Sequence, residues 1–333
     1  MKEITITKIN HGQRADKFIR KFLSDAPLSF IYKLFRIKDI KVNGKRINKE
    51  YILQENDFVQ IYVTDKQLEE FSKPRIMVKT NVNLDIIYED ENIIIINKPS
   101  GLLVHGDINE KRITLTNIVL NYLSEKGEFD VNNNQGYVPS PCHRLDRNTS
   151  GLIIFAKNIE SSHFLEDLFK TKENIKKNYV TLVAGTLYGK NKIDAPLYKD
   201  EEKNTVYVRN VKNGGKNALT YYEVKENFEN CTLVNVDLIT GRTHQIRVHM
   251  AYIGHPIIGD GKYGNINLNR KFEEKYHYNN QFLHAEKLTF LQINGTLSYL
   301  SNKTFIAPLP EKEKNNINQI RENKKIWLIV PFY

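Results

Sequence analysis

The segment HRLDRNTSGLIIF, residues 143–155, carries the most information about the fold and chemistry of this chain. It places one carboxylate, Asp146, between Arg144 and Arg147, and an apolar run follows directly. A short apolar run bounded by polar residues is typical of a buried strand. Nearby positive charge lowers the pKa of a carboxylate and keeps it in its nucleophilic form. The segment therefore indicates a reactive carboxylate beside a buried strand; the alternative is a solvated Arg–Asp turn on the surface.

Strand patterns outnumber helical patterns on both sides of this segment. We expect strands at residues 93–96, 152–156, 179–183, 234–238 and 288–291, and helices at 161–169 and 243–253. A charged stretch at 311–316 is expected to be a surface loop. Because the helices and strands do not alternate regularly, the pattern predicts an α+β fold on an extended, mainly antiparallel sheet with flanking helices.

The first quarter of the chain resembles a separate small α/β module. Apolar residues at helical spacing predict helices at 15–23 and 31–37, the second capped by Ser29. Strands are expected at 4–9 and 58–63, with a hairpin around Asn43-Gly44, the strongest short hairpin signal. A polar stretch around Pro74 then predicts a linker. The expected organisation is a module at 1–65, a linker at 66–84 and a larger domain at 85–333.

The charge of the chain is concentrated in this module. The net charge is +10, and residues 1–80 hold 17 Lys and Arg against 10 Asp and Glu, which accounts for +7 of it. Such a concentration suits contacts with phosphates, because each neutralised phosphate releases condensed counterions. The charge therefore favours an anionic partner such as a nucleic acid, although a solvated basic surface has the same composition.

Composition also limits the compartment. No apolar stretch approaches the roughly 20 residues that a membrane-spanning helix needs. Two cysteines, Cys142 and Cys231, do not make a disulfide framework. We therefore expect a cytoplasmic protein without a membrane partner, and a monomer.

The central segment and several others resemble one known family. Residues 143–151 are similar to the signature of the RluA family of pseudouridine synthases, and residues 97–105, 177–185, 241–249, 254–264, 283–285 and 307–308 follow in the order of that family. The resemblance covers nearly all of residues 85–312. It implies the pseudouridine synthase fold and an isomerase that converts selected uridines of an RNA to pseudouridine without a cofactor. The histidines lack the spacing of a metal site, so no metal is expected.

The module has a resemblance of its own. Residues 12–18, 36–38 and 42–46 are similar to the RNA-binding domain named after ribosomal protein S-four, and the whole chain looks closest to the RluC-type branch, which acts on large-subunit ribosomal RNA. This resemblance implies a structured RNA partner, ribosomal RNA before transfer RNA. The module residues expected at the RNA are Arg14, Lys17, Arg36, Lys38, Asn43, Lys45 and Arg46.

The resemblance also implies roles for residues of the larger domain. Asp146 matches the nucleophile of the family, which attacks the nucleotide at the sugar or at the base. Tyr179 matches an active-site tyrosine expected to stack on the uracil, and Arg247 matches the basic residue that pairs with the catalytic carboxylate. Further substrate contacts are expected from Arg144, which could fill the space of the flipped uridine, and from Ile246, His143, Arg147, Lys98, Arg242 and His244.

The chain departs from the family pattern at a few positions. Asn148 stands where the family usually has Asp, which removes one charge beside Asp146. Ala15 replaces a usual Leu of the RNA-binding domain, and Asn56-Asp57 replaces a Gly-Asp turn that Asn can still adopt. Two other functions stay open: a non-catalytic RNA-binding assembly factor, and an RNA hydrolase that uses Asp146 with histidines.

Overall fold

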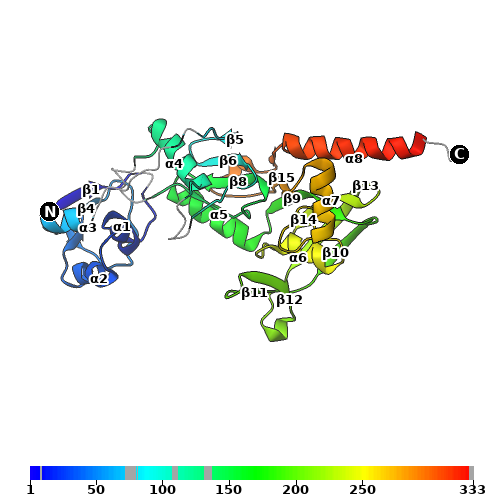
Figure 1. Cartoon of the computed structure of the whole chain (residues 1–333). Coiled ribbons are helices and arrows are strands. Elements are labelled where there is room, and N and C mark those ends of the chain that lie inside the picture. Colours follow the sequence, from blue (N-terminus) through cyan, green and yellow to red (C-terminus); the bar gives the residue numbers. More distant parts are fainter. Residues whose placement is uncertain (8–9, 72–79, 81, 107–111, 131–136, 330–333) are drawn as a thin grey trace. The chain divides into compact units, whose positions relative to one another are not determined.

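The computed structural model describes residues 1–7, 10–71, 80, 82–106, 112–130 and 137–329 (Figure 1). The chain divides into two compact units. One contains Met1–Ile95, His105–His143 and Ile154–Asp167, and the other contains Ile96–Val104, Arg144–Ile153 and Leu168–Tyr333. No helix within these described ranges has both the length and the apolar character needed to cross a bilayer.

The N-terminal module has two helices and a sheet of order β1-β4-β2-β3. Its elements are β1 (Lys2–Thr5), α1 (Ala15–Phe22), α2 (Leu28–Arg36), β2 (Ile40–Val42), β3 (Lys45–Arg46) and β4 (Phe58–Ile61). Strand β1 begins and ends earlier than expected, and residues 8–9 of the expected strand lie outside the described residues. The predicted cap at Ser29 is wrong: Pro27 precedes the helix, and its carbonyl accepts the N–H groups of Phe30 and Ile31 at 2.9 and 3.2 Å. Ser29 therefore lies within the first turn.

The hairpin between β2 and β3 forms where the sequence predicts it. Asn43 and Gly44 both have positive φ, 52° and 73°, as a two-residue turn of this kind requires. Asn56 is left-handed as well, with φ of 68°. The Asp57 carboxylate beside it accepts hydrogen bonds from the Asn43 side chain at 2.8 Å and from the Tyr51 hydroxyl at 3.1 Å. The Asn56-Asp57 turn thus survives without glycine.

A short helix, α3 (Asp65–Phe71), follows the module in the segment expected to be a linker. Leu68 and Phe71 pack against the module core, and the rings of Phe30 and Phe71 lie 4.9 Å apart. The main-chain N–H of Asp25 also donates to the Phe71 carbonyl at 3.1 Å. The helix therefore packs on the module, while the domain boundaries at 65 and 85 stay a prediction.

The larger sheet has the order β10-β13-β14-β9-β15-β8-β6-β5, with β16 beside β15 and β7 beside β8. Strands β8 and β15 run parallel, and the other pairs of this sheet with a defined register are antiparallel. Its strands are β5 (Ile86–Glu89), β6 (Ile93–Lys98), β7 (Ser140–Pro141), β8 (Ser150–Ala156), β9 (Ile175–Ala184), β10 (Lys190–Asp194), β13 (Leu219–Asn227), β14 (Cys231–Leu238), β15 (Leu283–Phe290) and β16 (Thr304–Ile306). The predicted α+β fold on a mainly antiparallel sheet is confirmed.

Helices and a separate hairpin complete the fold. They are α4 (Leu115–Glu125), α5 (Ile159–Thr171), α6 (Gln245–Tyr252), α7 (Ile266–Tyr276), α8 (Glu311–Ile329), two 3-10 turns at Val211–Asn213 and Ser298–Leu300, and the hairpin β11 (Leu197–Asp200)–β12 (Thr205–Val208). The expected helices at 161–169 and 243–253 correspond to α5 and α6. The expected loop at 311–316 is wrong, because these residues form the first part of α8 and bury Glu313 and Asn316.

The strand that follows Asp146 lies unusually close to β15. Gly151 on β8 has φ of 107°, and a Cβ there would lie 2.3 Å from the carbonyl oxygen of Ala285 and 2.6 Å from its nitrogen. Ala285 is in turn paired with Tyr179 on β9. Glycine at position 151 therefore allows β8 to join β15 beside the strand of Tyr179.

Gly151→Ala is expected to lower the free energy of unfolding by about 2–4 kcal/mol, because the methyl group meets main-chain atoms that cannot move aside. Gly254→Ala is the matched control: its φ is 84°, but no atom lies within 4 Å of the added Cβ. It should cost only about 1 kcal/mol of backbone strain. Urea unfolding of both variants checks the difference; equal losses would show that the close approach has no energetic weight.

Candidate active site

The loop that carries Asp146 is tied to neighbouring segments by hydrogen bonds. The Gln281 amide donates to the Thr149 hydroxyl at 2.9 Å, and the Gly101 N–H donates to the Arg147 carbonyl at 2.9 Å. Thr149 is buried, whereas the side chain of Asp146 remains 27% exposed. The loop is therefore anchored on both sides of a carboxylate that solvent or substrate can reach.

The Lys98 side chain is hydrogen-bonded to the loop that carries Asp146. Its side chain is fully buried, and Nζ donates to the carbonyls of Pro99, Leu102 and Arg147 at 2.8, 2.8 and 2.9 Å. Burial lowers the pKa of Lys98, and the attraction of Asp146 opposes this effect. An ammonium group has three donors, and all three are used here. The sequence predicts a substrate contact from Lys98. Such a contact would replace one of these three hydrogen bonds.

Arg247 joins Asp146 to a second carboxylate. Its Nη1 donates to Asp146 Oδ2 at 2.9 Å, while Nε and Nη2 hold the two oxygens of Asp260 at 2.7 and 2.9 Å. This bidentate pair is buried, with 10% of the Arg247 side chain and none of the Asp260 side chain exposed. Helix α6 carries Arg247 in its first turn. The expected Asp146–Arg247 pair is thus present, and Arg247 is fixed from the far side by Asp260.

The charge of Asp260 is stabilised by its surroundings. Burial opposes its ionised form, but the hydrogen bonds and charge of Arg247 outweigh burial and lower the pKa of Asp260. The main-chain N–H groups of Lys262 and Tyr263 donate to Oδ1 at 2.8 and 3.1 Å. Asp260 therefore stays ionised and holds the guanidinium in one orientation.

His244 lies near the same oxygen of Asp146 that Arg247 binds. Its Nε2 is 3.9 Å from Asp146 Oδ2, beyond hydrogen-bond distance, and its Nδ1 is 2.8 Å from the Tyr263 hydroxyl. Burial lowers the pKa of His244, which favours the neutral ring at neutral pH. The ring of Tyr263 also faces the Arg247 guanidinium, whose carbon lies 5.0 Å from the ring centroid. Tyr263 thus contacts both residues that surround the carboxylate.

Tyr179 lies on β9 between β14 and β15, opposite Val236 and Ala285. It is 5% exposed and belongs to the core cluster of this unit. Burial raises the pKa of Tyr179, and the negative charge of Asp146 raises it further. The tyrosine is therefore neutral at physiological pH and sits in the electrostatic field of the carboxylate.

The remaining expected substrate contacts fall into different environments. Arg144 and Arg242 are exposed, and Arg242 Nε donates to the Asn217 carbonyl at 3.0 Å. Ile246 is 4% exposed and packs in the core. His143 accepts the N–H of Ile154 at Nε2, at 3.3 Å. Arg144 and Arg242 are thus the exposed members of the expected set, whereas Arg147 and His244 are half-buried.

The basic residues expected at the RNA in the N-terminal module divide into two groups. Arg14 donates two hydrogen bonds to Asp16, at 3.1 and 2.8 Å. Asn43 is used within the module, since it donates to Asp57 and accepts the N–H of Phe58 at 2.8 Å. The others, Lys17, Arg36, Lys38, Lys45 and Arg46, are exposed. The exposed basic set therefore lies on α1, on the end of α2 and the turn that follows it, and on β3.

Sequence analysis gave no role to Asp260 and Tyr263, although both stand in segments that resemble the family. Asp260 follows Gly259, and a Cβ at Gly259 would lie 1.7 Å from the Asn280 carbonyl oxygen. An Asp beside a glycine in a tight turn is a detectable signal for a special site, but it does not name Arg247 as the partner. That pairing needs the three-dimensional structure.

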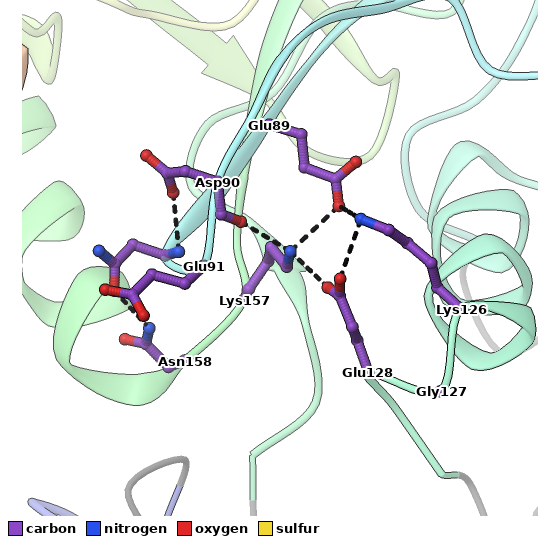
Figure 2. Close-up of a pocket in the computed structure, with 9 residues that line it drawn as sticks. Glu89, Asp90, Glu91, Lys126, Gly127, Glu128, Lys157 and Asn158 are labelled. Atoms are coloured by element: carbon purple, nitrogen blue, oxygen red, sulfur yellow. Dashed lines mark hydrogen bonds and ion pairs between the residues drawn. The ribbon is translucent and has the colours of Figure 1, made fainter.

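A hollow of about 540 Å³ lies elsewhere, in the other unit, and is lined by charged residues (Figure 2). Lys157 contacts Glu89 at 3.0 Å and also contacts Glu128, and Lys126 contacts both glutamates at 2.9 Å. The lysines and glutamates thus neutralise one another and join the β5–β6 turn to the end of α4. This hollow is lined by an ion-pair network and does not include the residues of the candidate active site around Asp146.

The chain matches the family model described as RNA pseudouridylate synthase over residues 92–252, which include Asp146, Tyr179 and Arg247. The fold and this match agree with the sequence resemblance. The chain belongs to the RluA family of RNA pseudouridine synthases, isomerases that convert uridine to pseudouridine.

Three similar proteins show how far the sequence and fold similarity extends. The ribosomal large subunit pseudouridine synthase C of Escherichia coli strain K12 is 35% identical over 326 residues, 96% of this chain and 97% of that protein. The protein of the same name from Vibrio parahaemolyticus is 38% identical over 289 residues, 84% and 85% of the two chains. The solved human RNA pseudouridylate synthase domain containing 4 is 24% identical, with a TM-score of 0.56 over 71% of this chain and 92% of that chain. This last similarity concerns the fold alone.

Proposed function

We propose that this pseudouridine synthase isomerises uridines of large-subunit ribosomal RNA and that Asp146 is its nucleophile. The observation that carries the proposal is the asymmetric holding of the carboxylate. Arg247 binds Oδ2 at 2.9 Å, and within the described residues Oδ1 has no hydrogen-bond partner. One oxygen is thus fixed in place while the other is available to the nucleotide.

The reaction places clear demands on the site. The bond between C1′ of the ribose and N1 of uracil breaks, the base turns, and a bond between C1′ and C5 forms. The proton lost from C5 is balanced by a proton gained at N1, so no oxidant or reductant is consumed. A carboxylate held in position by Arg247 can attack the nucleotide, and a flat, neutral side chain can retain the detached base.

Tyr179 suits the second task. Its ring is a stacking surface for an extruded base, as in other enzymes that act on flipped nucleotides. Because the pKa of Tyr179 is raised, its hydroxyl keeps its proton and can donate a hydrogen bond to the uracil. We assign the stacking role to Tyr179 and the orienting role to Arg247.

The choice of RNA rests on the relatives and on the module. The Escherichia coli and Vibrio proteins are named for the ribosomal large subunit, and they match 96% and 84% of this chain. The exposed basic residues on α1, α2 and the hairpin offer a surface for phosphates. We propose that residues 1–65 are an RNA-binding domain that adds affinity for the large ribosomal substrate.

A tritium-release assay tests the function. Ribosomal RNA carrying tritium at C5 of uridine loses the label when the base is rejoined through C5, so release without added metal or cofactor is the expected result. Transfer RNA labelled in the same way is the comparison substrate. Release from transfer RNA alone would keep the enzyme and change its substrate; no release from either RNA, by folded and RNA-bound protein, would favour a non-catalytic assembly factor.

The Lys45→Gln, Arg46→Gln double variant tests the module. These residues are exposed on β3, so their loss should leave the fold intact and weaken binding of ribosomal RNA by about tenfold in 0.1 M salt. The Lys190→Gln variant, which changes an exposed lysine paired with Glu223 at 2.8 Å, is the control. Equal affinities of the two variants, measured by filter binding, would argue against the hairpin as an RNA contact.

A further inference from the structure

Three cationic side chains come together at Gly241. An ideal Cβ at this glycine would lie 3.6 Å from the Nζ of Lys177 and 4.0 Å from the Nζ of Lys172. Arg242 is the next residue along the chain. The three cations come from different elements: Lys172 directly follows α5, Lys177 lies on β9, and Arg242 precedes α6. Gly241 has no side chain that would separate them.

These cations have no acidic partner. Within the described part of the chain, no carboxylate forms an ion pair with Lys172, Lys177 or Arg242. Burial, together with the nearby charge of Lys172, lowers the pKa of Lys177 to about 8. Burial and the charge of Arg242 lower the pKa of Lys172 in the same way. The folded protein thus holds like charges together at a cost that an external anion would remove.

The cluster at Gly241 differs from the ion-pair network in Figure 2, where the lysines contact carboxylates. There, Lys126 and Lys157 are matched by Glu89 and Glu128, and the lysines hold the fold together. At Gly241, Arg242 Nε donates to the Asn217 carbonyl, and the Lys177 ammonium lies 5.5 Å from the centroid of the Phe169 ring. Both contacts leave N–H donors on the arginine and the lysines for a ligand.

The cluster lies beside the candidate active site. Lys177 and Tyr179 are two residues apart on β9, so their side chains point to the same face of the sheet, about 7 Å apart along the strand. Arg242 precedes His244 by two residues. A nucleotide whose base stacks on Tyr179 can therefore bring a neighbouring phosphate to this cluster.

We propose that Lys172, Lys177 and Arg242 bind one phosphate of the RNA backbone next to the target uridine. The inference rests on the proposed function, since it takes the RNA strand to pass Tyr179. A phosphate supplies the missing negative charge, and its oxygens can accept from two ammonium groups and a guanidinium together. The site adds two residues, Lys172 and Lys177, to the contacts expected from the sequence.

Lys177→Met removes the charge and keeps a side chain that can cover Phe169. The matched control is Lys176→Met, which removes the same charge from the adjacent, exposed residue on the opposite face of β9. We expect Lys177→Met to weaken binding of a ribosomal RNA fragment about tenfold and to reduce the slope of log affinity against log salt by about 1. The control should change affinity by less than about twofold. Circular dichroism confirms that both variants are folded.

Neutral linkages locate the phosphate. Synthetic RNAs that contain the target uridine carry one methylphosphonate at each flanking position in turn. For one of these positions, the modified RNA should bind the wild-type protein about tenfold more weakly than unmodified RNA does. The Lys177→Met variant should bind that modified RNA and unmodified RNA with equal affinity. If every methylphosphonate lowered the affinity of both proteins equally, the proposed site would be wrong. The site would also be wrong if the Lys177 and Lys176 variants bound RNA with equal affinity and equal salt slope.

The two proposals fail in different ways. Wild-type protein that forms no pseudouridine contradicts the proposed function, whatever the Lys177 variant does. Wild-type protein that forms pseudouridine, together with a Lys177 variant that binds RNA like the Lys176 variant, contradicts the phosphate site alone.

Discussion

Asp146→Asn is expected to abolish release of tritium from C5-labelled RNA, with a fall in rate of at least about 10⁴-fold. The amide has nearly the shape of the carboxylate but is not a nucleophile. Its oxygen can still accept from Arg247 Nη1, the bond that measures 2.9 Å in the native protein. The loop should therefore keep its structure, and RNA affinity should stay within about threefold of the wild type.

Asp237→Asn is the matched control for this experiment. Asp237 is an exposed carboxylate on β14 that contacts the side chain of Asn178. Its loss should change the single-turnover rate by less than about twofold. Substantial activity of Asp146→Asn, measured on freshly prepared protein at saturating RNA, would remove Asp146 from the role of nucleophile.

Asp260→Asn is expected to have the second largest effect, although Asp260 does not contact the reacting carboxylate. It removes the charge that faces the buried guanidinium of Arg247, whose Nε and Nη2 it holds at 2.7 and 2.9 Å. Breaking a buried pair of this kind should lower the free energy of unfolding by about 3 kcal/mol. Arg247 then loses its fixed orientation, and a small displacement of Asp146 should lower the single-turnover rate by about 100-fold.

Glu226→Gln provides a control at a more exposed Arg–carboxylate pair. Glu226 binds Arg321 through Nε and Nη2 at 2.9 and 2.7 Å, but the two side chains are 32% and 45% exposed. Solvent screens this pair, so the free energy of unfolding should fall by about 0.5 kcal/mol or less, with no change in rate. Similar losses for both variants in urea unfolding would mean that burial of the Arg247–Asp260 pair has no special weight.

The parts of the fold that the sequence predicts well are those decided by neighbouring residues. The Asn43-Gly44 turn is one, since both residues tolerate the positive φ that the hairpin needs. Helix α8 is the opposite case. Its buried residues Glu313, Ile317 and Ile320 stand at helical spacing, but one of them is charged and Asn and Lys surround them. The burial of Glu313 depends on the Tyr278 hydroxyl, 3.0 Å away in a distant segment.

The same division holds for the candidate site. Asp146, Tyr179 and Arg247 are identified from the sequence because each stands in a segment that resembles the family. Their arrangement is not, because Asp146 and Arg247 are 101 positions apart and meet only after α6 has docked. The support that Asp260 and Lys98 give to the site also depends on contacts between separate segments. Local sequence patterns identify the candidate catalytic residues, and contacts between distant segments determine which residues position them.

Strand β15 also sets the distance between two parts of the candidate site. Ala285 pairs with Tyr179 on one side and with Gly151, which closely follows the Asp146 loop, on the other. The separation of Tyr179 from the start of β8 is thus set by two strand spacings, each about 4.8 Å. Because main-chain pairing within the sheet sets this separation, we expect it to persist when a loop outside these strands changes in length.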